Sequence, residues 1–78
     1  MPQETIRLSS LHQGESAIIE AFSDEVMKQQ LLEMGCLPGE KITIDRFAPL
    51  GCPVAILVNG STLGIRLEEA QAILVKPL

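Results

Sequence analysis

The sequence predicts a mostly β protein, a small β-barrel of about five strands with one α-helix inserted after the first core strand. Short segments rich in β-branched residues recur along the chain, an Asn-Gly pair separates two of them, and Gly and Pro mark tight turns. Barrel closure is favoured because it hides strand edges that an open sheet would expose. An α+β open sheet covered by the helix is the main alternative.

The first core strand is predicted at residues 16–22, a short segment rich in β-branched residues that follows Gly14. Ser23 is the expected N-cap of the helix, because its hydroxyl can accept a hydrogen bond from an early backbone amide. Asp24 and Glu25 then lie near the positive end of the helix dipole.

The helix is predicted over residues 24–34. Met27, Leu31 and Met34 recur at spacings of four and three, so they share one helical face, which we expect to pack inward. Gly35 is expected to end the helix, because a residue without Cβ readily adopts the positive φ of a C-terminal cap.

A type II turn is predicted at Pro38-Gly39, since proline presets φ at the first central position and glycine tolerates a positive φ at the second. The next strand is predicted over residues 41–47. Ile42 and Ile44 alternate there with polar residues, which indicates a strand with one face in water.

Asn59-Gly60 is the strongest hairpin signal, because a type I′ turn requires positive φ at two successive residues. A helical turn at residues 67–70 and a last strand at residues 72–75, stopped by Pro77, follow the hairpin. A two-residue loop fixes the strand register, and the expected pairs are Val58 with Ser61, Ile56 with Leu63, Val54 with Ile65, and Ala55 with Gly64.

Length and composition indicate one domain. We assign it to residues 6–78, after a loose leader at residues 1–5 that lacks periodicity. Of the 78 residues 46% are hydrophobic and only two are aromatic, so the core is built from Leu, Ile, Val and Met. An interior this small is filled by side chains and leaves no room for a substrate cavity.

The overall charge and the cysteine pattern exclude several classes of protein. A net charge of −4 repels nucleic-acid phosphates, so no nucleic-acid partner is expected. No hydrophobic run approaches the roughly 20 residues of a membrane span, and we expect a soluble, cytoplasmic protein. Cys36 and Cys52 form no CxxC pair and are expected to be free thiols.

Three motifs occur in a fixed order along the chain. A leucine pair, a glycine and Leu-Pro-Gly occupy residues 31–39, Ala-Pro-Leu-Gly occupies residues 48–51, and an apolar-Arg pair at residues 65–66 precedes a closing strand at residues 73–75. Together they resemble the ferrous iron transport protein A family, FeoA, small cytoplasmic partners of the bacterial ferrous iron transporter FeoB. The resemblance extends over residues 8–75.

The resemblance implies an SH3-like β-barrel without catalysis or cofactor. It also implies a non-enzymatic accessory protein that binds the cytosolic GTP-binding domain of FeoB, supports the transporter's assembly or activity, and associates with the membrane only through it. A metal-sensing or regulatory module, similar to the C-terminal domain of iron-dependent repressors, is the runner-up. The oligomeric state stays open, because small barrels readily pair through unsatisfied edges.

Two positions depart from the family pattern. The family often has Asp where this chain has Cys52, and often Arg or Lys near Gln30. The loss of a carboxylate at Cys52 puts in doubt any polar contact that the family makes from that loop.

Five residues are candidates for partner binding: Leu31, Met34, Leu37, Leu50 and Gly51. Leu50 lies in a Pro-rich loop, where its side chain either meets a partner or folds back over the barrel end. The helical spacing of Leu31 and Met34 favours a place in the core. Leu37 lies beyond the helix cap and is freer to be exposed.

No catalytic, cofactor-binding or metal-binding residue is assigned. His12, Cys36 and Cys52 offer nitrogen and sulfur, but they lack the close pairs that deliver four ligands to zinc. One histidine, no phosphate-binding glycine loop and no nucleophile elbow argue against an enzyme. Arg66 is expected within a strand, with its side chain snorkelling from the barrel.

Overall fold

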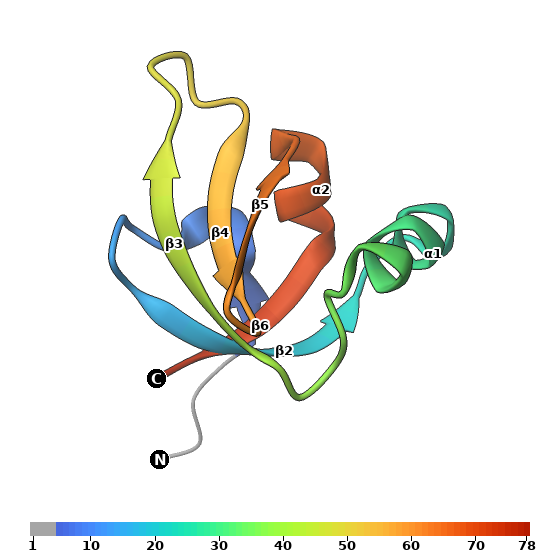
Figure 1. The fold of residues 1–78 in the computed structure, drawn as a ribbon. Coiled ribbons are helices and arrows are strands. Elements are labelled where there is room, and N and C mark those ends of the chain that lie inside the picture. Colours follow the sequence, from blue (N-terminus) through green and yellow to red (C-terminus); the bar gives the residue numbers. More distant parts are fainter. Residues whose placement is uncertain (1–4) are drawn as a thin grey trace.

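The computed structural model describes residues 5–78, which form one curled antiparallel sheet with two α-helices (Figure 1). Across the sheet the strands are ordered β1-β6-β2-β3-β4-β5. The elements are β1 Ile6–Arg7, a 3₁₀ turn Leu8–Ser10, β2 Ser16–Phe22, α1 Glu25–Met34, β3 Lys41–Phe47, β4 Val54–Val58, β5 Ser61–Ile65, α2 Leu67–Ala72 and β6 Ile73–Pro77. The predicted fold class is confirmed, whereas residues 1–4 of the predicted leader lie outside the described residues.

The described chain has six strands, one more than the five expected. The additional strand is β1, whose Ile6 pairs with Val75 and whose Arg7 pairs with Leu74 of β6. Two residues are too few to show a periodicity, so the pattern of the sequence could not reveal this strand. Leu8, directly after β1, is fully buried.

The N-cap of α1 is Asp24, and the expectation that Ser23 caps the helix is wrong. The Asp24 carboxylate accepts hydrogen bonds from the amides of Val26 at 2.8 Å and Met27 at 3.1 Å. The Ser23 amide instead donates to the Ala72 carbonyl at 2.8 Å, which ties this residue to the end of α2. The first amides of the helix therefore find their acceptor in the Asp24 carboxylate and not in the Ser23 hydroxyl.

We expect Asp24→Ala to lower the free energy of unfolding by about 0.5–2 kcal/mol, because two helix amides lose their acceptor. Asp24→Asn retains the acceptor and should cost less. Ser23→Ala should cost less than about 0.5 kcal/mol, since its hydroxyl lies 3.5 Å from the Ala72 carbonyl oxygen. Urea titrations followed by circular dichroism would measure all three, and an equal loss in the two alanine variants would contradict the assignment.

The end of α1 and the turn after it match the sequence expectations. Gly35 has φ of 102°, and the Cys36 amide donates to the Leu31 carbonyl at 2.9 Å, which satisfies one of the last helical carbonyls. The Glu40 amide donates to the Leu37 carbonyl at 3.1 Å, closing the predicted turn at Pro38-Gly39. The Gly39 amide donates to the Ile19 carbonyl at 2.8 Å, which fixes this turn to β2.

The β4–β5 hairpin has the predicted turn and register. Asn59 and Gly60 have φ of 51° and 80°, as a type I′ turn requires. All four predicted pairs occur, from Val58 with Ser61 to Val54 with Ile65.

The sequence did not predict the irregularities in β2 and β3, where the pairing register shifts at residue 20 and at residue 45. Such bulges increase the local twist and help an antiparallel sheet to curl.

The C-terminal elements differ slightly from the predicted bounds. Helix α2 extends through Ala72, so β6 begins at Ile73 and runs on to Pro77. Arg66 is the N-cap residue of α2 and does not lie in a strand. Its amide donates to the Glu69 carboxylate at 2.8 Å, a contact typical of a helix start. The two acidic residues after Leu67 favour this local helix over a continued strand.

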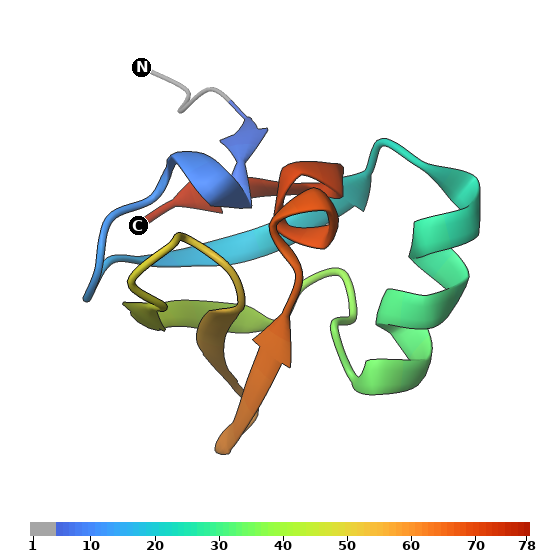
Figure 2. The ribbon, with the colours of Figure 1, turned by 90° about the horizontal axis from the view of Figure 1, so that it is seen from above.

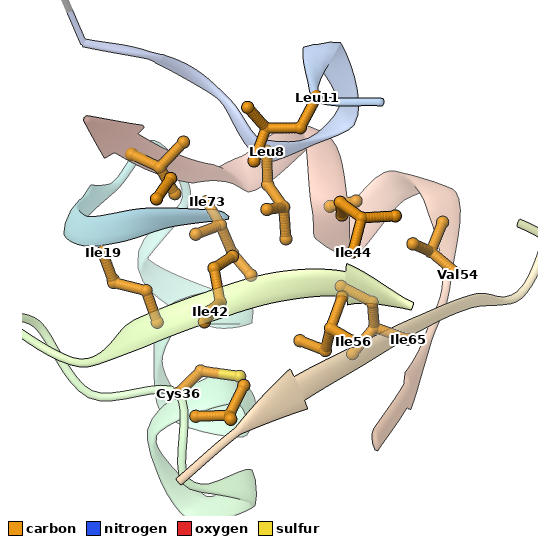
Figure 3. Close-up of a cluster of buried hydrophobic side chains, with 14 of the residues drawn as sticks. Leu8, Leu11, Ile19, Cys36, Ile42, Ile44, Val54, Ile56, Ile65 and Ile73 are labelled. Atoms are coloured by element: carbon orange, nitrogen blue, oxygen red, sulfur yellow. The ribbon is translucent and has the colours of Figure 1, made fainter. Parts of the chain in front are cut away.

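The core is a single cluster of aliphatic side chains between the curled sheet, the 3₁₀ turn and the helices (Figure 3). Among the described residues no polar or charged side chain is buried. The largest members of the cluster are Leu8, Ile19, Leu31, Ile42, Ile44, Ile56, Ile65 and Ile73. Side chains therefore fill the interior, and any partner must bind on the outer surface.

Candidate partner-binding surface

Large hydrophobic side chains that remain exposed are the main candidates for partner binding, because the core buries most of the other large hydrophobic side chains. Six such residues are exposed in the described part of the chain, namely Val26, Met34, Leu37, Leu50, Leu57 and Leu78. Three of the five residues predicted from the sequence are among them. Gly51 has no side chain to contribute, and Leu31 lies elsewhere.

Leu50 is the most exposed of these residues, with 96% of its surface accessible. It lies in a four-residue turn closed by the Gly51 amide, which donates to the Ala48 carbonyl at 2.7 Å. Pro49 takes the first central position and Gly51, with φ of 86°, the last position. Leu50 is therefore held at the corner of the turn, and its side chain does not fold back over the barrel end.

Two further contacts fix the base of this loop, residues 48–53, which we call the Leu50 loop. The Ala48 amide donates to the Pro53 carbonyl at 3.1 Å. Cys52 Sγ accepts a hydrogen bond from the Leu67 amide at 3.4 Å, which links the loop to the start of α2. Cys52 thus makes a polar contact from this loop although its side chain carries no carboxylate.

The helix end gives a second exposed spot, formed by Met34 at 36% and Leu37 at 45% exposure. We call these two residues the helix-end patch. Leu31, also a candidate, is fully buried, so its side chain is not accessible to a partner and serves the core as its spacing predicted. Met34 shares that helical spacing, but it is the last residue of α1 and is only partly covered.

The structure does not bring all the candidate residues together. Leu37 precedes β3 and Leu50 follows it, so the seven residues of that strand separate the helix-end patch from the Leu50 loop (Figure 1). Figure 2 shows α1 to one side of the curled sheet. A partner that contacts both spots must therefore span the length of β3.

Val26 is an exposed residue that sequence reasoning missed, with 73% of its surface accessible. It lies in the first turn of α1, next to the inward stripe that contains Met27. Its position off that stripe is the signal that could have identified it. Leu57, 39% exposed, points to the outer face of β4 because its neighbours Ile56 and Val58 point inward.

The two cysteines lie in different environments, and both are free thiols as predicted. Cys36 is fully buried, and this burial, followed by the negative charge of Glu69, raises the pKa of its thiol. Cys52 is exposed.

His12 is also exposed, and its ring lies 3.0 Å from the Glu15 carboxylate. Within residues 5–78 no group of three or more His, Cys, Asp and Glu side chains is arranged to hold a metal ion.

A shallow hollow of about 260 Å³ lies between the start of α1, α2 and β1. Its charged lining residues are Arg7, Asp24 and Glu68, which carry both signs of charge. The Asp24 carboxylate already caps α1. The hollow therefore does not offer a single-sign site for a charged ligand.

No helix among the described residues is long and apolar enough to span a membrane.

These features define a small β-barrel of the SH3-like kind whose exposed apolar residues lie on a loop and a helix end. The chain belongs to the FeoA domain family, whose model matches residues 6–77. FeoA is a family of ferrous iron transport, and the resemblance seen in the sequence is confirmed.

Three relatives illustrate this membership. A fusion of Fe(2+) transport protein A and the Fe(2+) transporter FeoB from Porphyromonas gingivalis is 36% identical over 72 residues, or 91% of this chain, which spans only 8% of the fusion protein. A FeoA-like protein from Clostridium acetobutylicum is 29% identical, with a TM-score of 0.91 over 100% of this chain and 91% of that one. Stenotrophomonas maltophilia FeoA, a prokaryotic SH3 domain protein complexed with zinc, is 26% identical, with a TM-score of 0.78 over 91% of this chain and 89% of that one.

Proposed function

We propose that this protein is a non-enzymatic accessory subunit of bacterial ferrous iron uptake that docks on the cytosolic GTP-binding domain of FeoB and supports the transporter's assembly or activity. The observation that carries the proposal is the Porphyromonas gingivalis relative, in which a FeoA domain and FeoB form one polypeptide. Two domains joined in one chain act at the same place. On this proposal the protein is cytosolic and reaches the membrane through the transporter.

The Leu50 loop is the proposed main contact. Leu50 is nearly fully exposed on a loop that internal hydrogen bonds and the Cys52 contact hold in place, so little conformational entropy is lost when a partner covers it. The helix-end patch, Met34 and Leu37, is the proposed second contact. Large apolar side chains on fixed supports are typical anchors of protein interfaces.

We expect Leu50→Glu to weaken binding to the cytosolic domain of the cognate FeoB at least about tenfold, because a charged carboxylate would be buried at the contact. Leu37→Glu should weaken binding in the same direction. Isothermal titration calorimetry with the purified domain measures both effects.

Leu78→Glu is the matched control, since it adds the same charge at an apolar residue that is 69% exposed at the C-terminus. It should leave the affinity within about twofold of the wild type. Unchanged binding by both Leu50→Glu and Leu37→Glu would refute the proposed surface. Absence of binding by the folded wild-type protein would refute the docking proposal itself.

A further inference from the structure

Strand β5 forms one edge of the sheet and hydrogen-bonds only to β4 (Figure 2). Edge strands carry a row of backbone groups that can pair with another strand. The opposite edge, β1, is only two residues long, whereas β5 has five residues in regular register with β4. The edge of β5 is therefore the longer open pairing surface of this sheet.

The hairpin geometry determines which backbone groups of β5 face outward. In a hairpin with a two-residue type I′ turn, the residues flanking the turn, Val58 and Ser61, form a hydrogen-bonded pair, and hydrogen-bonded and non-hydrogen-bonded pairs then alternate. Thr62 and Gly64 consequently direct their N–H and C=O groups away from β4. Among residues 5–78, no turn, loop or cap hydrogen bond engages these four groups.

This edge lacks the usual protection against pairing. Natural edge strands are commonly blocked by charged residues, prolines or bulges. Strand β5 has the sequence Ser-Thr-Leu-Gly-Ile, which contains no charged residue and no proline. It also pairs with β4 without a register shift. Thr62 and Gly64 are both exposed. A Cβ placed on Gly64 would meet no atom within 4 Å, so there is free space beside this residue.

We propose that the edge of β5 pairs antiparallel with β5 of a second copy of this protein, related by a two-fold axis at Leu63. In this register Thr62 of each copy faces Gly64 of the other, and the four outward N–H groups meet four outward carbonyls. The Thr62 side chain then lies beside a residue without a side chain. Leu63 meets its symmetry equivalent as a non-hydrogen-bonded pair, in which side chains approach most closely.

The register favours a second copy as the occupant, because it places Thr62 of each copy beside Gly64 of the other, and the local charge distribution does not oppose this pairing. In this register Arg66 lies opposite Gly60 of the other copy, so the strand and its flanks bring no like charges together. The net charge of −4 on each copy acts only at longer range and is screened by salt. The contact buries less than the roughly 800 Å² per partner of a stable complex, so we expect a weak dimer with a Kd of about 0.1–1 mM.

Thr62→Pro tests the pairing with little effect on the hairpin, because it removes an N–H that faces away from β4. Thr62→Ala is the matched control that keeps this N–H. Sedimentation equilibrium from about 0.05 to 1 mM should show concentration-dependent dimers for wild type and Thr62→Ala, and at least about tenfold weaker association for Thr62→Pro. The association should persist or increase with added NaCl. A wild type that stays monomeric over this range, or a Thr62→Pro variant that dimerises equally, would overturn the proposal.

A disulfide test reports the register. In a Cys52→Ser background, which removes the exposed native thiol, Leu63→Cys should form a covalent dimer on mild oxidation, because facing Cα atoms of such a pair lie within disulfide range. Ser61→Cys in the same background is the control, since the two residues 61 would lie about 14 Å apart. Cross-linking at residue 61 but not at residue 63 would overturn the proposed register. The pairing does not depend on the proposed docking to FeoB, and Thr62→Pro leaves the Leu50 loop intact.

Discussion

Replacement of Leu31 by alanine should lower the free energy of unfolding by about 2–5 kcal/mol. Leu31 is the one residue of α1 that is fully buried, and it joins the helix to the core cluster. A ten-residue helix is too short to be stable alone, so α1 depends on this packing. Small domains have a total stability near 5 kcal/mol or somewhat more, so the loss should be a large fraction of it.

Met34→Ala is the control for Leu31→Ala, because Met34 lies on the same helical face but is 36% exposed. It should cost about 1 kcal/mol or less. The chain has no Trp or Tyr, so urea unfolding should be followed by far-ultraviolet circular dichroism. Equal losses for the two variants would contradict the assignment of Leu31 to the core and Met34 to the surface.

The elements that the sequence predicted well have local causes. The turn at Asn59-Gly60 depends on two positive φ values, and its two-residue length fixes every pair of the hairpin. The cap at Gly35 likewise depends on one residue. The alternation of Ile42 and Ile44 with polar residues indicates that β3 has one buried face, and both isoleucine side chains are buried in the structure.

The features that the sequence did not reveal depend on contacts across the fold. Ser23 and Asp24 are both good N-cap residues, which the sequence alone does not separate; in the fold Asp24 caps the helix, while the Ser23 amide bonds to Ala72, 49 residues away. β1 exists because β6 provides a partner for two residues. Arg66 starts a helix because Glu69 accepts from its amide.

The exposure of the candidate residues was predicted in part. The turn chemistry of Pro49 and Gly51 marks a loop, but whether Leu50 points outward depends on the space above the barrel end, which is a tertiary property. The helical spacing correctly placed Leu31 in the core. It could not show that the Met34 side chain, on the same helical face, stays 36% exposed. The separation of Leu37 from Leu50 by the length of β3 also required the structure.

Cys52 should react with a thiol reagent such as Ellman's reagent at the rate of an exposed thiol, and Cys36 at least about a thousandfold more slowly. Cys52 is exposed, whereas Cys36 is fully buried and becomes accessible only when the helix end opens or the protein unfolds. A stability of about 5 kcal/mol corresponds to an open fraction below about one in a thousand. In the folded state burial, and after it the charge of Glu69, raises the pKa of the Cys36 thiol, so the closed protein itself offers little thiolate to the reagent.

The two native thiols can be separated with Cys52→Ser, which should leave one slowly reacting thiol, and both should react at once in about 6 M guanidinium. Because Leu31 packs in the same core cluster as Cys36, Leu31→Ala should accelerate labelling of Cys36 about 30-fold or more, matching its loss of about 2 kcal/mol or more. Labelling of Cys36 within tenfold of Cys52 in the folded protein would contradict its burial. Acceleration by Leu31→Ala without a change in stability would instead indicate that the helix end opens locally, which would place the helix-end patch on a mobile support.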